Sequence, residues 1–250
     1  MESRLDGRGK HPIVFCDANL KKHSMSLAAT SLPPALREGD RLTAKEFLRR
    51  WDAMPDLKRA ELIGGIVFMS SPVSKPHGKS HLSLGAWLWL YADLTPGCEA
   101  LAESTWVMGP DNVPQPDVSL RIMPEYGGQS QDAGEYASGA PELIMEVSGS
   151  SSSRDLGVKL ELYQRSGVKE YLTILLKPNR LIWRQLVRGR YREIEPRADG
   201  LLCSRVFPGL WLDPEAVSNP KKSLRTALEQ GINSPEHAAF VRKLAEKNKK

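Results

Sequence analysis

The sequence is poor in cysteine, with three residues in 250. Cys16, Cys98 and Cys203 are odd in number, far apart and in no metal-binding spacing, which argues against a disulfide framework and a cysteine-based zinc site. Long apolar runs are also missing: the most apolar stretch, residues 82–94, is too short for a membrane span and is interrupted by a glycine and an aspartate. The first 30 residues contain no continuous apolar segment of the kind a secretion signal needs. These absences predict a soluble, cytoplasmic protein with no membrane association.

What is present is enough for a full core. Hydrophobic residues make up 40% of the chain, and at this length one domain with irregular ends is expected. The formal net charge is +5 and the pI is near 9.1, which permits nucleic-acid binding. Residues 242–250 hold five basic side chains against one acid, so much of the excess charge belongs to the C-terminal end and says little about a binding cleft.

The chain divides into three regions by pattern. Residues 1–40 show no sustained periodicity, which predicts a mostly disordered extension. Residues 41–212 form the expected domain, and residues 213–250 read as a helical, basic C-terminal tail. The domain opens with Thr43 and Glu46, the two positions of a capping box, which predict a short helix through Trp51.

A hairpin and a long helix are expected next. Gly64-Gly65 separates two apolar runs within residues 60–69, and paired glycines allow the positive φ that tight hairpins need. Residues 77–94 carry apolar side chains at helical spacing on one face, and the opposite face is apolar too. Such a helix should be buried on two sides, either between the sheet and other helices or in an oligomer interface.

The remaining elements follow from period and turn signals. Residues 124–140 contain four glycines and few large apolar groups, which predicts a loop. A helix is expected from a capping box at Ser152 and Asp155 to about Arg165, closed by Gly167. Strands are expected at residues 98–102, 105–108, from 116, 143–147, 171–176, 180–187 and 191–194.

The candidate chemistry lies on two of these strands and the following helix. Strands project alternate side chains to opposite faces, so Asp117 and Glu146, near the ends of two strands, can converge while their neighbours pack elsewhere. Two carboxylates suit a hard cation such as Mg²⁺, and the main-chain carbonyl of Val147 offers a third ligand. Lys159 shares a helix face with apolar residues, which would direct its ammonium toward the sheet, where it could orient a water or offset phosphate charge.

Each of these residues also has a simpler interpretation. A second Pro-Asp pair occurs at Pro55 and Asp56, an acid that ends a strand is usually solvated, and a helical lysine usually lies on the surface. The order of Asp117, Glu146 and Lys159 around a strand and a capped helix favours one site over three unrelated surface charges.

Two histidines admit alternatives as well. His77 and His81 lie four residues apart at the start of the expected helix, a spacing that suits zinc. No third ligand is evident in the sequence, so the favoured role is contact of His77 with a substrate phosphate at the helix N-terminus.

Residues 41–212 resemble the putative restriction endonuclease family of the PD-(D/E)XK nuclease superfamily. The resemblance implies an α/β, restriction-endonuclease-like core, with a mixed central β-sheet flanked by helices. It also implies metal-dependent hydrolysis of DNA phosphodiester bonds, Asp117 and Glu146 as ligands of Mg²⁺ or Mn²⁺, and Glu61 as a residue that holds a water on the metal. The matching segments are residues 60–66, 76–78, 116–118, 140–148, 154–160, 163 and 167–171.

The sequence departs from the superfamily signature at one position. A lysine usually stands two residues after the second acid, but this chain has Ser148 there. In this family a lysine of the next helix is thought to replace it, and Lys159 matches that position. Two hypotheses follow: a metal-dependent DNA endonuclease, expected to be a homodimer because two sites suit two strands, or a catalytically inactive DNA-binding or assembly protein on a nuclease fold.

Overall fold

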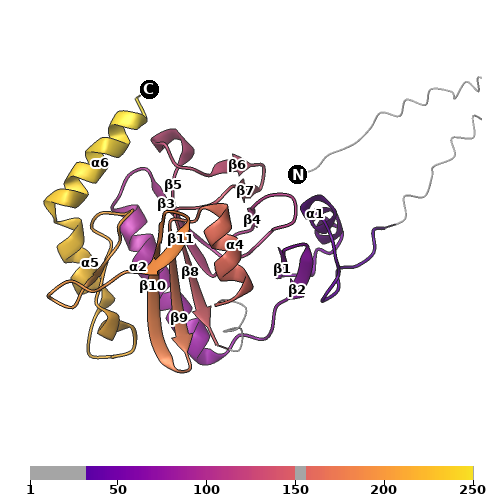
Figure 1. Ribbon diagram of the computed structural model, residues 1–250, viewed down its shortest axis with the longest axis horizontal. Helices are drawn as coiled ribbons and strands as arrows, with labels where there is room; N and C mark the ends of the chain where they lie inside the picture. Colours follow the sequence, from indigo (N-terminus) through magenta and orange to yellow (C-terminus); the bar gives the residue numbers. More distant parts are fainter. Residues whose placement is uncertain (1–31, 150–155, 250) are drawn as a thin grey trace, which may run out of the picture. The chain divides into compact units, whose positions relative to one another are not determined.

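A six-stranded mixed sheet forms the centre of the protein (Figure 1). The computed structural model describes residues 32–149 and 156–249. The strand order is β11-β10-β9-β8-β5-β3, and β8 and β9 run parallel whereas the other neighbouring pairs are antiparallel. The strands are β3 (Cys98–Ala102), β5 (Val118–Ile122), β8 (Leu143–Ser148), β9 (Glu170–Leu176), β10 (Asn179–Val187) and β11 (Arg190–Glu193).

Helices cover both faces of this sheet, as the alternation of buried residues along β8 requires. Met145 and Val147 join the cluster of α2 (Lys75–Asp93), whereas Ile144 joins the cluster of α4 (Val158–Ser166). All six residues of β8 are buried, which is what a central strand covered on both sides shows. The predicted α/β class, with a mixed sheet between helices, is therefore confirmed.

The hairpin and the capped helix precede the sheet in sequence. Helix α1 (Ala44–Asp52) begins where Thr43 accepts a hydrogen bond from the N–H of Glu46, at 3.3 Å. The side chain of Glu46 does not complete the capping box: it pairs with two arginines of its own helix. Strands β1 (Ala60–Ile63) and β2 (Ile66–Met69) form the expected hairpin, and both turn glycines have positive φ.

Only the end of the predicted N-terminal extension, residues 32–40, lies among the described residues. Residues 1–31 lie outside the described residues. Residues 33–40, which we also assigned to the extension, pack with the hairpin: Leu36 is buried in its cluster, and the N–H of Gly39 bonds the carbonyl of Val67 at 2.8 Å. One apolar residue in a polar, proline-containing run gave no periodic signal.

The expected loop at residues 124–140 is more ordered than its composition predicts. It contains the 3₁₀ turn η1 (Pro124–Tyr126) and two short strands, β6 (Gln131–Ala133) and β7 (Tyr136–Ser138). Strand β7 pairs in parallel with β4 (Trp106–Val107), more than 25 residues earlier in the chain. Three-residue strands show too little alternation to be predicted from sequence. Their formation depends on pairing with a strand that is distant in the chain.

The C-terminal segment packs on the α2 face. It contains β12 (Leu202–Cys203), β13 (Trp211–Leu212), the 3₁₀ turn η2 (Pro214–Val217), α5 (Leu224–Ile232) and α6 (Pro235–Lys247). Leu228 and Leu244 are buried in the same cluster as α2. Residues 213–249 thus contain two helices, α5 and α6, and both contribute to the core.

Helix α2 is buried on one side and only partly on the other. Leu84, Trp87, Leu88, Tyr91 and Ala92 are its buried residues. Leu82 and Trp89, seven residues apart and so on one face, are 75% and 58% exposed. The second apolar face is therefore partly open.

Across the described ranges, no helix has the length and apolar character that crossing a membrane requires.

Candidate active site

Asp117 and Glu146 lie opposite each other at one end of the paired strands β5 and β8. Val118 pairs with Met145 in this antiparallel ladder, so Asp117, one residue before Val118, lies opposite Glu146, one residue after Met145. Residues opposite each other project to the same face of a sheet. Both acids are buried, with 2% and 3% of their surface exposed. The convergence expected from strand alternation is what the structure contains.

Asp117 is surrounded by donors. Its Oδ2 accepts the N–H of Val147 at 2.7 Å, its Oδ1 accepts from the Arg59 guanidinium at 2.9 Å, and the Nε2 of His77 lies 3.5 Å from Oδ1. Burial opposes the charged form of this acid, but the bonds from His77, Arg59 and Val147 outweigh it and hold the pKa of Asp117 well below its ordinary value. The carboxylate is therefore anionic at neutral pH.

Glu146 shares a lysine with Glu61. The Nζ of Lys159 lies 2.8 Å from Oε1 of Glu146 and 2.9 Å from Oε1 of Glu61, and each of the three side chains is at most 7% exposed. The hydroxyl of Tyr163 also donates to Oε1 of Glu146, at 2.9 Å. Burial and the neighbouring carboxylates raise the pKa of Tyr163 well above its ordinary value, so the phenol remains a donor.

Helix α4 carries Lys159 to this position. It runs from Val158 to Ser166, and Gly167 closes it in the left-handed conformation, as expected from the sequence. Its start is later than predicted, since Leu156 and Gly157 form a turn, and the predicted cap at Ser152 and Asp155 lies outside the described residues. The buried face consists of Lys159, Leu162 and Tyr163, at i, i+3 and i+4 spacing.

Ser148 occupies the strand position where the superfamily has its lysine. It is the last residue of β8, is 1% exposed, and projects to the same face as Glu146 two residues earlier. Lys159 supplies a cation to that carboxylate from the helix instead. The geometry therefore allows Lys159 of the helix to take the place of the strand lysine, as the family pattern implies.

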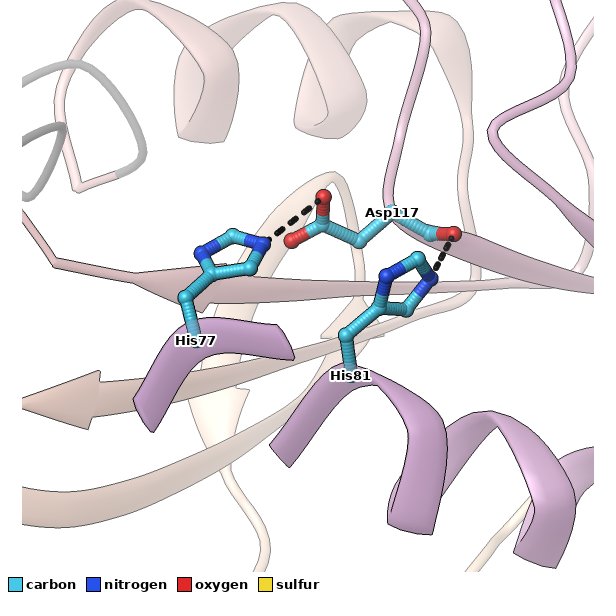
Figure 2. A group of neighbouring side chains, drawn as sticks. All are labelled: His77, His81 and Asp117. Carbon is cyan, nitrogen blue, oxygen red and sulfur yellow. Dashed lines mark hydrogen bonds and ion pairs between the residues drawn. The ribbon is translucent and has the colours of Figure 1, made fainter. Parts of the chain in front are cut away.

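Two histidines of α2 also converge on Asp117 (Figure 2). The Nε2 of His81 lies 2.9 Å from the main-chain oxygen of Asp117, while His77 faces its carboxylate. The sequence spacing identified the pair of histidines, but their partner lies 36 residues further along the chain from His81. Arg59, two residues before Glu61, was not anticipated. Its alternation with Glu61 at the start of a strand was the available signal.

These residues line one cleft of about 670 Å³. Its lining includes Arg59, Glu61, His77, Asp117, Glu146 and Lys159, and its rim includes the exposed Lys177 and residues 70–74. All the side chains singled out for catalysis from the sequence therefore meet in one cavity. The main chain of Val147 lies there too, between the two strand-end acids.

The donor set fits a divalent cation. Mg²⁺ and Mn²⁺ take carboxylate and carbonyl oxygens, and two buried carboxylates side by side in an open cleft provide such donors. Asp117 and Glu146 would hold the ion. The carbonyl of Val147 as a further ligand, and a water held by Glu61, stay predictions.

Comparisons with known proteins identify a family and a similar fold. A comparison with curated protein sequences finds no match. The fold is similar to that of the crystal structure of a putative nuclease of the family DUF820 from Anabaena variabilis ATCC 29413. That structure is 16% identical in sequence, with a TM-score of 0.53, and the match covers 75% of this chain and 98% of the other. The model of the Uma2 family, described as putative restriction endonuclease, matches residues 44–215. Because that match spans more than half of the chain, the protein belongs to the putative restriction endonuclease family.

Proposed function

We propose that the protein is a metal-dependent endonuclease that hydrolyses phosphodiester bonds in DNA. The observation that carries the proposal is the meeting of Asp117, Glu146 and Lys159 in one cleft, each almost fully buried. Family membership supports nuclease chemistry. A charged cluster of this kind is costly to bury, which favours a role in chemistry over a role in stability alone.

The residues would divide the work as follows. A divalent cation, Mg²⁺ or Mn²⁺, supplies a Lewis acid to the scissile phosphate when it is bound by Asp117 and Glu146. Lys159, next to Glu146, would orient the attacking water and offset charge that develops on phosphate oxygens. Glu61 holds the Lys159 ammonium from its other side and would position a water. His77 at the cleft wall would contact a substrate phosphate near the N-terminus of α2.

A homodimer and a cytoplasmic location complete the proposal. Leu82 and Trp89 form an exposed apolar strip on α2, of the kind that association buries. Two copies would bring two active sites to the two strands of DNA. Cys98 and Cys203 are buried free thiols, which suits a reducing compartment.

The inactive alternative rests on Ser148. If Lys159 does not serve the chemistry, the same cleft binds DNA or metal without cleavage, and the exposed strip on α2 would then serve assembly. The distance of 2.8 Å between Lys159 and Glu146 favours the enzyme.

The test is Mg²⁺-dependent cleavage of supercoiled plasmid by purified wild-type protein and the Asp117→Asn variant. We expect the variant to lose cleavage, because the charge that holds the cation is gone. Asp56→Asn is the matched control, since Asp56 lies in the other Pro-Asp pair and is exposed. Circular dichroism checks that both variants fold. Equal nicking by Asp117→Asn and wild type would overturn the assignment of Asp117.

A further inference from the structure

The first two turns of α2 present two imidazoles to one acid. His77 and His81 are four residues apart, so they lie on one helical face, and Figure 2 shows both rings turned toward Asp117. Ser74 caps the helix by accepting the N–H of His77 at 3.4 Å, which fixes where these turns begin. One ligand atom from each of the three residues lies within 4.8 Å of the others.

This donor set differs in kind from the pair of carboxylates next to it. Imidazole nitrogens suit Zn²⁺, Co²⁺ and Ni²⁺, whereas Mg²⁺ and Mn²⁺ are bound mainly through oxygen. A metal at about 2.1 Å from each of its ligands brings tetrahedral donors to roughly 3.4 Å from one another. The Nε2 of His77 is already 3.5 Å from Oδ1 of Asp117, and the other separations, which are at most 4.8 Å, have to close by up to about 1.4 Å.

The surroundings are also those of a metal ligand. The Nε2 of His81 donates to the main-chain carbonyl of Asp117 at 2.9 Å, because a carbonyl oxygen only accepts. In the neutral imidazole Nδ1 therefore holds the lone pair that can bind a metal, and it lies 4.0 Å from Oε1 of Glu103. A backbone carbonyl on the far nitrogen of a ligating histidine fixes the tautomer and the orientation of the ring. The histidine side chains are 17% and 20% exposed, and His77 lines the cleft, so an ion can reach them.

We propose that His77, His81 and Asp117 form a second metal site, selective for divalent transition metals, on the α2 side of Asp117. Asp117 bridges it to the two-carboxylate position beside Glu146. The effect of this site on cleavage rests on the proposed function, whereas metal binding by the histidines can be measured without catalysis.

Co²⁺ is the probe, because its visible absorption reports nitrogen ligation and low coordination number directly. We expect the full-length wild-type protein to develop ligand-field bands on titration with Co²⁺. Zn²⁺ in excess should remove them, and Mg²⁺ in excess should not. His77→Gln and His81→Gln should each weaken Co²⁺ binding at least tenfold, and the double variant should show no bands at the concentrations that saturate the wild type.

Glu146→Gln is the control that separates the two positions. It alters the two-carboxylate site but leaves both histidines and Asp117, so the Co²⁺ bands should persist in it. Circular dichroism of each variant establishes that it is folded. Unchanged Co²⁺ bands in the double histidine variant, or no bands in the folded wild type, would overturn the proposal. Bands lost in folded Glu146→Gln would also overturn it, because the ion would then lie at the carboxylates.

Plasmid cleavage measured on the same samples keeps this result apart from the proposed function. Wild-type protein that shows the histidine-dependent bands but does not cleave DNA with any divalent metal refutes the nuclease proposal and leaves the metal site standing. Cleavage with Mg²⁺ in the absence of histidine-dependent bands does the reverse.

Discussion

Lys159 is the residue at which stability and chemistry can be tested together. Its ammonium lies between Glu61 and Glu146, and Lys159→Met keeps the length of the side chain while removing the charge. Two buried carboxylates would then face each other without their shared cation. Breaking a buried ion pair by removing one partner costs about 3–5 kcal/mol. In a domain of this size each kcal/mol lowers the melting temperature by roughly 2–4 °C, so we expect a fall of about 10 °C without divalent metal.

Metal should recover part of this loss. A cation bound by Glu146 replaces some of the missing positive charge, so added Mg²⁺ should stabilise Lys159→Met more than it stabilises the wild type. The cleavage rate should not recover in the same way. Loss of a group that stabilises transition-state charge lowers the rate by about 100- to 1,000-fold, roughly 3–4 kcal/mol.

The assay combines thermal unfolding, equilibrium DNA binding and single-turnover cleavage at saturating Mg²⁺ on the same variant. Lys177→Met is the control, because Lys177 lies on the rim of the same cleft and is exposed. It should change the salt dependence of binding at most, with a slope lower by about one. Lys159→Met protein with normal single-turnover cleavage and weakened DNA binding would refute the catalytic role. A normal melting temperature would refute the buried ion-pair argument.

Three further outcomes are expected from other parts of the molecule. Trp89→Ser should convert the proposed dimer to a monomer in light scattering at micromolar concentration, and a monomeric wild type would contradict the dimer. Burial raises the pKa of Glu170 from 4.5 to about 7 against four hydrogen bonds that lower it. The stability from this acid is thus complete below pH 4.5 and is lost as pH rises through about 7. Denaturation at pH 5 and pH 8 should show a fall of roughly 3 kcal/mol that Glu170→Gln lacks, and parallel profiles would refute this. Glu142→Ala should destabilise by about 2–5 kcal/mol, because it leaves two N–H groups unpaired. The exposed Glu125→Ala should not, and equal melting of the two would count against that role.

The fold could be predicted where the pattern was long and local. The hairpin at Gly64-Gly65, the helix that ends at Gly167 and the strand of Glu146 each carry their own turn or period signal, and the structure contains all three. Strands β6 and β7 were missed, since three residues show no usable alternation and their pairing with β4 is non-local.

The candidate site shows the same division. Asp117, Glu146 and Lys159 could be selected together because strand alternation and helix spacing aim them at one region. The closeness of His81 to Asp117 has no local signal, because it depends on how a helix packs beside a strand 36 residues away. Arg59 alternates with Glu61, but nothing local indicates that its guanidinium reaches Asp117, 58 residues along the chain. Asp117, Glu146 and Lys159 thus follow from local patterns, whereas the contacts of Arg59 and His81 with Asp117 follow from packing alone.

The parallel pairing of β8 and β9 has a consequence for how such a site can change during evolution. Parallel neighbours cannot be joined by a tight turn, so the chain between them has to cross one face of the sheet, and here that crossing contains α4. In this chain the crossing brings α4 over Glu146, and Lys159 reaches the carboxylate from it. In this chain the strand position holds Ser148, and the positive charge beside the acid comes from Lys159 of the helix. The crossover helix therefore offers a second position for the cation, so the strand motif can vary while the charge beside Glu146 is kept.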